Sequence, residues 1–223
     1  MKFSAIITAG GTSSRFGNTN KLLEKIYGTE IIKYTVEAFV HAELDEIIIT
    51  ANSSIVEILS KMFATYETVR IVQGGSSRQE SVYNGLKAIK NCDYVLIHDG
   101  ARPMITPELI TKVKTAVIEK KAISVMTKTI DTIKEVDSFG KIIKTIDRSK
   151  LYNTQTPQAF EFNLIKSAHE KLQKENFTDD SGMVEALGTD VYIVDGDYKN
   201  IKVTTKSDLA LAKVYLADKN TCF

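Results

Sequence analysis

The sequence has few of the residues that fix a fold or a compartment through covalent or charge chemistry. Its two cysteines, Cys92 and Cys222, lie far apart and form no CxxC pair. We therefore expect neither a disulfide framework nor a zinc site, and we expect a reducing, cytoplasmic location. The 29 Lys and Arg nearly cancel the 28 Asp and Glu, giving a net charge of +1. No long-range basic field exists to collect nucleic acid or an anionic membrane, so any anion must be bound locally.

Long apolar runs are also absent. No segment approaches the roughly 18 uninterrupted apolar residues of a membrane span. The apolar stretch within residues 1–10 is shorter than the roughly 7 to 15 residues of a signal-peptide core, so we expect no signal peptide. With 43% hydrophobic and 26% charged residues the composition is that of a globular protein. A length of 223 residues favours one domain, since a domain takes about 150.

Short β-branched runs alternate along the chain with stretches of helical period, a pattern typical of a parallel sheet covered by helices. We predict an α/β fold: one domain over residues 1–223, a Rossmann-like three-layer sandwich with a mostly parallel, twisted sheet. The predicted strands are Phe3–Thr8, Glu46–Thr50, Val69–Gln73, Tyr94–His98, Ile123–Met126, Ile142–Ile146, Val191–Val194 and Ile201–Thr204. The predicted helices are Ile31–His41, Ser54–Phe63, Gln79–Lys90, Pro107–Lys120, Leu164–Lys174, Ser181–Leu187 and Ser207–Ala217.

Residues 129–150 break this alternation. Two β-prone segments, Thr129–Val136 and Lys141–Ile146, flank the turn sequence Asp137-Ser138-Phe139-Gly140, and together they predict a hairpin. A two-stranded ribbon is only marginally stable alone. We therefore expect this protruding arm to pack against a partner subunit.

Glycine-rich turns follow two of the predicted strands. Residues 8–17 read TAGGTSSRFG and are followed by Lys21, and residues 74–82 read GGSSRQESV. Glycines and small hydroxyl residues let backbone N–H groups approach an anion, and Arg15 and Lys21 add positive charge. The first turn fits neither GxGxxG nor GxxxxGK[ST], so it predicts phosphate binding of another kind than in dehydrogenases or P-loop NTPases. A merely flexible turn is the alternative in both places.

Asp99 follows the fourth predicted strand in the sequence HDGARP. Ligands of open α/β sheets bind at the carboxyl ends of the strands, and one carboxylate there suits Mg²⁺, which keeps water and phosphate oxygens as its other ligands. A turn-forming or capping aspartate is the alternative. We expect His98 to pack rather than catalyse, and His41 and His169 to lie at the surface or half-buried. The absence of HExxH and GxSxG leaves zinc and serine hydrolysis without support.

Ordered motifs along nearly the whole chain resemble the 2-C-methyl-D-erythritol 4-phosphate cytidylyltransferase family. They are AGGTSSRFG with Lys21, GGSSRQESV, HDGARP, Asp131-Thr132, TIDRSKLY, QTPQAF, TDD and NIKVTT. The ribitol-5-phosphate cytidylyltransferases share the first loop, QTPQ and the late lysine motif. Ala9-Gly10-Gly11 is the form commoner among them, where the first family usually has Ala-Ala-Gly. CDP-ribitol synthesis is therefore the alternative.

The resemblance implies a homodimer that transfers a cytidylyl group from CTP to a sugar-alcohol phosphate. It implies that the nucleoside is held by Ala9, Gly10, Gly11, Gly75, Ser76 and Ser81. The phosphates of CTP would contact the catalytic cations Arg15, Lys21 and Lys202, and Asp99 would bind Mg²⁺. The sugar-alcohol phosphate would lie among Arg102, Thr156, Thr178 and Lys202, with Thr132 and Arg148 arriving from the second subunit. Competing classes are a pyrophosphorylase using another base, an NAD-dependent oxidoreductase, and a nucleotide-binding regulator without catalysis.

Overall fold

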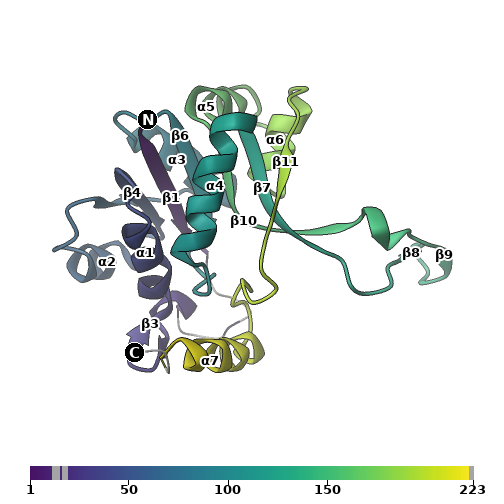
Figure 1. The fold of residues 1–223 in the computed structure, drawn as a ribbon, viewed down its shortest axis with the longest axis horizontal. Coiled ribbons are helices and arrows are strands. Elements are labelled where there is room, and N and C mark those ends of the chain that lie inside the picture. The colour runs from purple at the N-terminus through teal and green to yellow at the C-terminus, as the bar shows by residue number, and fades with distance from the viewer. Residues whose placement is uncertain (12–15, 17–19, 221–223) are drawn as a thin grey trace.

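The computed structural model describes residues 1–11, 16 and 20–220. A seven-stranded sheet has the order β11-β7-β10-β6-β1-β4-β5 (Figure 1). Its strands are β1 (Phe3–Ala9), β4 (Glu46–Ala51), β5 (Val69–Gln73), β6 (Tyr94–Asp99), β7 (Ala122–Lys128), β10 (Tyr152–Glu161) and β11 (Tyr192–Asp195). Within this sheet only β10 runs antiparallel, to both β6 and β7. The predicted mostly parallel α/β sheet is confirmed.

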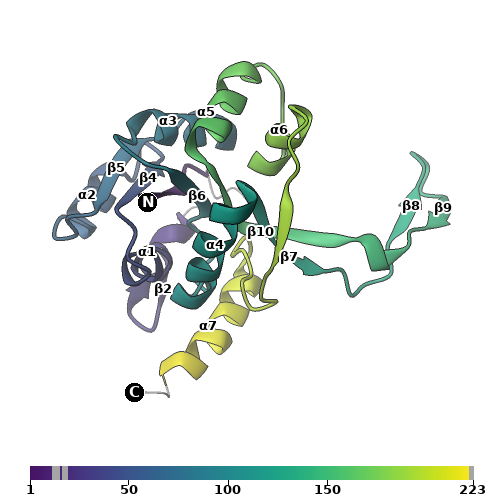
Figure 2. The same cartoon turned by 45° about the horizontal axis from the view of Figure 1, so that its top comes forward.

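Helices cover both faces of the sheet (Figure 2). They are α1 (Ile31–His41), α2 (Val56–Met62), α3 (Arg78–Ala88), α4 (Pro107–Lys120), α5 (Phe162–Lys171), α6 (Asp180–Ala186) and α7 (Lys206–Asn220). Alternate residues of β1 separate two apolar clusters: Ala5 and Ile7 pack with α1, α2, α4 and α7, while Ile6 packs with α3, α5 and α6. The period-2 alternation of a strand thus builds the three layers. No helix in the described part of the chain has the length and apolar character needed to cross a bilayer.

Local start signals explain why two helices begin where predicted. The Thr106 hydroxyl accepts a hydrogen bond from the amide of Leu109, and Pro107 occupies the first turn of α4. At α7 the Thr205 hydroxyl accepts from the amide of Asp208, whose carboxylate accepts from the amide of Thr205. This reciprocal pair is a capping box with Asp in place of Glu.

The sheet differs from the prediction in two places. Ile201–Thr204 forms no strand, because its backbone bonds elsewhere: the Val203 amide donates to the Ala101 carbonyl, and the Thr204 amide donates to Asp208. The long strand β10 was not predicted. Pro157 in its middle argues against a central strand, and the register indeed shifts between Thr154 and Gln158.

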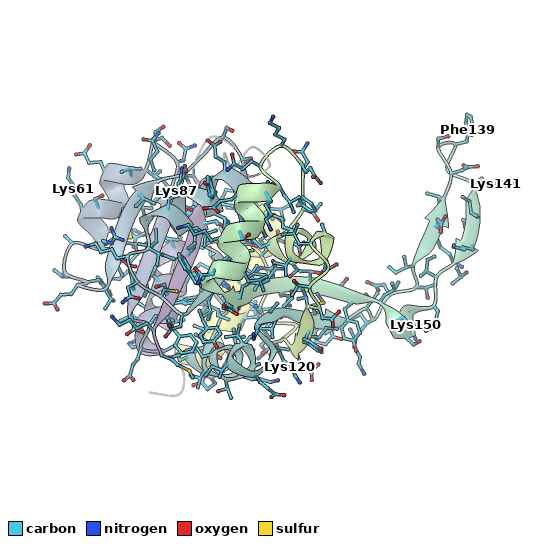
Figure 3. The ribbon with its side chains drawn as sticks, turned by 90° about the horizontal axis from the view of Figure 1, so that it is seen from above. Lys61, Lys87, Lys120, Phe139, Lys141 and Lys150 are labelled. Atoms are coloured by element: carbon cyan, nitrogen blue, oxygen red, sulfur yellow. The ribbon has the colours of Figure 1, made fainter. Side chains whose placement is uncertain are left out.

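The predicted hairpin forms an arm that projects from the body of the molecule (Figure 1). Its paired strands are shorter than predicted, β8 (Lys134–Val136) and β9 (Ile142–Thr145). The Asp137 carboxylate accepts from the amides of Phe139 and Lys141, and Gly140 supplies the positive φ of the turn. Figure 3 shows Phe139 and Lys141 at the far end of the arm.

The remaining described elements are small. A two-stranded ribbon, β2 (Lys25–Ile26) and β3 (Thr29–Glu30), lies between the first loop and α1. Two short 3₁₀ helices are η1 (Lys21–Leu23), which places Lys21, and η2 (Arg148–Lys150) at the base of the arm.

The thiol of Cys92 is free and donates to the carbonyl of Tyr94. Cys222 lies outside the described residues, so the reducing compartment stays a prediction.

Candidate active site

A cavity of about 360 Å³ opens at the carboxyl ends of β1, β5 and β6. Described residues of both glycine-rich turns line it, 8–11 from the first and 75–78 from the second. This is the edge of the sheet at which ligands of open α/β sheets bind. Lys21 enters from η1, and Lys202 enters from the segment before α7. The predicted residues that line it are Ala9, Gly10, Gly11, Lys21, Gly75, Ser76, Ser81, Asp99 and Lys202. Arg15 lies outside the described residues, so its predicted role is untested.

The Ser81 hydroxyl joins the second turn to helix α3. It accepts a hydrogen bond from the amide of Gly75 at 3.0 Å and donates to the carbonyl of Ser77 at 2.8 Å. A Cβ atom built on Gly10 would lie 3.0 Å from the same hydroxyl oxygen, so glycine allows the first turn to approach it closely. Ser81 therefore fixes the shape of the cavity, besides lining it.

A second cavity of about 510 Å³ lies next to the first, between β10 and the start of α6. Four residues predicted to surround the sugar-alcohol phosphate line it: Arg102, Thr156, Thr178 and Lys202. Arg78, Asp99 and Lys202 belong to both cavities. The boundary between the two spaces is therefore a cluster of charged side chains.

Asp99 is the centre of this cluster. Its carboxylate oxygens lie 3.0 Å from Lys202 Nζ, 3.2 Å from Arg102 Nε and 3.4 Å from Arg78 Nε. Burial alone would raise the pKa of Asp99, but the charges of Lys202, Arg78 and Arg102 outweigh it and hold that pKa well below its ordinary range. Asp99 is therefore ionised at neutral pH, and three cations from distant parts of the chain are gathered at one point.

His98 packs inside the sheet, as predicted. Its ring is fully buried, with Nδ1 2.9 Å from the Thr156 hydroxyl and Nε2 3.5 Å from the Arg102 carbonyl. Burial lowers its pKa to about 3, so the ring is neutral. Because a carbonyl only accepts, Nε2 is assigned the proton, and Thr156 then donates to Nδ1. The same Thr156 oxygen accepts from the amide of Asp99, so it links β10 to the charge cluster.

Three important side chains were not assigned roles from the sequence. Arg78 begins α3 and bridges two carboxylates, those of Asp99 and Asp180. Asp180 in turn lies 3.2 Å from His169, and both are 1% exposed. The prediction that His169 lies at the surface or half-buried is wrong, because the packing of α5 on α6 buries it. A cation in the first turn of a helix is unfavourable, and that was the available signal that Arg78 needs acidic partners elsewhere.

Thr132 and Arg148 line neither cavity within one chain. Both are exposed on the arm, where Arg148 Nη1 donates to the carbonyl of Ile130 at 2.6 Å. Their predicted contact with the sugar-alcohol phosphate would require a second subunit.

The fold and these two cavities define a class of protein. An open α/β sheet that carries glycine-rich turns and converging cations at its carboxyl edge is a nucleotide-binding protein able to hold a polyphosphate beside a second anion. The family model described as IspD, 2-C-methyl-D-erythritol 4-phosphate cytidylyltransferase, matches residues 3–218. The chain belongs to this family, the first of the two cytidylyltransferase families that the motifs resemble.

Relatives and solved structures are similar to this chain along almost its full length. A 2-C-methyl-D-erythritol 4-phosphate cytidylyltransferase of Caldanaerobacter subterraneus is 42% identical, covering 97% of this chain and 99% of its own. One of Bacillus pumilus is also 42% identical, with 97% of each chain covered. The crystal structure of 4-diphosphocytidyl-2C-methyl-D-erythritol synthase from Anaerococcus prevotii is 34% identical, with a TM-score of 0.88 over 97% of this chain and 96% of that one.

Proposed function

We propose that this chain is a nucleotidyltransferase that joins CTP and 2-C-methyl-D-erythritol 4-phosphate, giving 4-diphosphocytidyl-2-C-methyl-D-erythritol and pyrophosphate in isoprenoid biosynthesis. A phosphate oxygen of the alcohol forms a bond to the α-phosphorus of CTP, and the bond from that phosphorus to the bridging oxygen breaks. The observation that carries the proposal is the pair of adjacent cavities that share Arg78, Asp99 and Lys202. Two substrates bound on either side would meet at these charges.

CTP would occupy the first cavity. The glycine-rich turns, with Ser76 and Ser81, would hold the nucleoside, and Arg15, Lys21 and Lys202 would neutralise the phosphates. Arg102, Thr156 and Thr178 would hold the phosphate of the alcohol in the second cavity. Neutralisation matters because two anions must come together, and fixed cations stabilise the charge that develops during phosphoryl transfer.

No general base is required for this reaction. A phosphate monoester has a second pKa near 6, so its attacking oxygen is already largely ionised at neutral pH. His98, the histidine nearest to the cluster, is neutral and bonded within the sheet. Alignment and charge compensation are therefore what the chain itself contributes.

We propose Asp99 as the ligand of a divalent cation, Mg²⁺. No group of three acidic, His or Cys side chains gathers as a metal site among the described residues. A single buried carboxylate at the boundary of the cavities nevertheless fits Mg²⁺, because this ion commonly takes one carboxylate and completes its shell with phosphate oxygens and water. When bound, it would add positive charge at the phosphates, and Asp99 would exchange one of its present cation contacts for it.

The arm would complete the site of a second subunit in a homodimer. Its strands are exposed on both faces, and apolar side chains are uncovered along it: Ile130, Val136, Phe139, Ile142 and Ile143 are 52% to 93% exposed. An isolated ribbon with this much apolar surface needs a covering partner. A second copy would cover it and receive Thr132 and Arg148 beside its sugar-alcohol phosphate.

Pyrophosphate release in the presence of Mg²⁺ tests the proposal. We expect release with CTP and 2-C-methyl-D-erythritol 4-phosphate, and little with ribitol 5-phosphate or with GTP, UTP or ATP. A preference for ribitol 5-phosphate would overturn the substrate and leave the chemistry standing. Binding of CTP without turnover would instead make the chain a regulator.

A further inference from the structure

A buried chain of polar contacts runs from the charge cluster into the layer formed by α3, α5 and α6. Arg78 Nη1 lies 2.8 Å from Asp180 Oδ2, and Asp180 Oδ1 lies 3.2 Å from His169 Nε2. On its other side, Arg78 Nε lies 3.4 Å from Asp99. The guanidinium is thus held between two carboxylates that come from different elements, β6 and α6.

Local structure does not favour the position of Arg78. It is in the first turn of α3, where the helix dipole opposes a cation. Burial also disfavours its charge, yet the carboxylates of Asp180 and Asp99 outweigh this and raise its pKa. A guanidinium has five N–H donors in a planar fork, so engaging Nε and Nη1 fixes its plane and directs the other donors. Arg78 lines both cavities, which is where the reacting phosphates would meet.

Asp180 is itself held firmly. The Gln158 side chain on β10 accepts hydrogen bonds from the backbone amides of Asp180 and Ser181, and it donates to Asp179 at 2.7 Å. Gln158 is fully buried. The backbone of Asp180 is therefore anchored to the central sheet.

His169 supports the far side of the Asp180 carboxylate. A carboxylate only accepts, so His169 Nε2 is assigned as the donor. The imidazole stacks on the Tyr83 ring, with centroids 6.2 Å apart and planes inclined by 2°. Tyr83 belongs to α3, the helix that Arg78 begins. The contacts therefore run from α3 to α6 and α5 and return to α3.

We propose that Asp180 and His169 are positioning residues, which hold the Arg78 guanidinium at the boundary of the two cavities where it contacts the phosphates during transfer. The inference rests on the proposed function. Asp180 restrains the fork directly, and His169 acts through Asp180. Loss of either should slow the chemical step more than it weakens the binding of CTP.

The test is a double-mutant cycle read as kcat and KM. Asp180→Asn keeps the size of the side chain and removes its charge, and we expect kcat to fall about tenfold with KM for CTP changed by less than about threefold. In an Arg78→Met background the same substitution should lower kcat by less than about twofold, because the residue through which Asp180 acts is gone. His169→Gln should show the same pattern with a smaller loss. Asp190→Asn, at an exposed carboxylate beyond α6, is the matched control and should resemble wild type.

Equal losses of kcat from Asp180→Asn with and without Arg78 would overturn the inference, since loss of a merely structural role lowers kcat alike in both backgrounds. Wild-type kinetics in Asp180→Asn would overturn it too. Should that variant fail to fold, the cycle of His169→Gln with Arg78→Met decides in the same way. Absence of pyrophosphate release by the wild-type protein would instead defeat the proposed function, and the inference with it.

Discussion

At the residue scale, Asp99 organises the candidate site through its charge. Its carboxylate contacts Lys202, which lies more than one hundred positions later in the chain. It also contacts Arg78 and Arg102, which lie on either side of it in the sequence. Without this carboxylate, three cations would repel one another in a partly buried space. Asp99 therefore holds the site together before any substrate arrives, and it would also serve Mg²⁺.

Lys21 should be needed for turnover more than for stability. It lines the first cavity, where the triphosphate of CTP would lie. Removal of a donor that stabilises a transition state typically lowers turnover about 10²- to 10³-fold, and we expect that loss for Lys21→Ala at saturating CTP. Pyrophosphate release measures it. Lys25→Ala is the control, because Lys25 is exposed and paired with Glu30. Near-normal turnover of Lys21→Ala would disprove the role.

His98 should make stability depend on pH. Its pKa is about 3 in the folded chain and about 6.5 when unfolded, so the unfolded state binds more protons between these values. The free energy of unfolding should therefore fall as pH drops from about 6.5 to 4.5, by up to about 1.4 kcal/mol per pH unit. Urea unfolding measures the slope. His98→Gln should flatten it, whereas His41→Gln, at an exposed position, should not. An unchanged slope in His98→Gln would contradict the prediction.

Part of the candidate site could be predicted from the sequence, because several of its residues follow strands in glycine-rich turns. Asp99 and Gly75 could be placed at the sheet edge from the strand pattern alone, whereas Lys202 was assigned through the resemblance. The pairing of His169 with Asp180 could not be predicted, because it depends on how α5 packs on α6 and leaves no spacing signal.

At the element scale, β10 joins the arm to the second cavity. The strand leaves the arm near Tyr152, passes Thr154 and Thr156 at the cavity, and reaches the core at Phe160. It was missed because Pro157 argues against a central strand. The helices Ile31–His41 and Pro107–Lys120 were predicted to the residue, since apolar periodicity and, for the second, a capping threonine and proline mark them. Ile201–Thr204 was wrongly predicted as a strand because buried Val203 gives it a strand-like pattern while its backbone bonds elsewhere.

Arg148 tests the role of the arm. If it contacts the phosphate of the alcohol, Arg148→Ala should raise KM for 2-C-methyl-D-erythritol 4-phosphate about 10- to 100-fold, the range expected for a lost charge-assisted hydrogen bond. KM for CTP should change far less. Steady-state kinetics with each substrate varied in turn measures both. Lys61→Ala on α2 is a control at an exposed cation distant from the arm (Figure 3). Equal changes in the two KM values would refute the assignment.

At the scale of the whole molecule, Thr132 and Arg148 lie on the arm and line neither cavity of their own chain. If they contact the sugar-alcohol phosphate, as we propose, a single chain cannot form the whole site. A dimer in which arms are exchanged would supply them in trans. This arrangement would make each site a composite of two chains, with Lys21 from one and Arg148 from the other.

Mixing two impaired variants should therefore restore activity, when it is measured at a 2-C-methyl-D-erythritol 4-phosphate concentration well below the raised KM of Arg148→Ala. In a mixed dimer of Lys21→Ala and Arg148→Ala chains, one site carries both defects and the other carries neither. After random reassociation of equal amounts, about a quarter of wild-type activity should return, since about half the dimers are mixed and each has one intact site. Pyrophosphate release after joint refolding measures this, against each variant refolded alone. If Arg148 served its own chain, mixing would restore nothing.

The continuity of β10 also makes the arm a spacer of fixed length. Each strand residue advances the backbone by about 3.3 Å and turns its side chain to the opposite face. One residue inserted between Tyr152 and Thr154, where β10 pairs with β7, would therefore shift the register or form a bulge and so redirect the arm. A longer turn at Gly140 would leave the base of the arm in place. Changes in length should be tolerated at the tip of this segment and not along its stem.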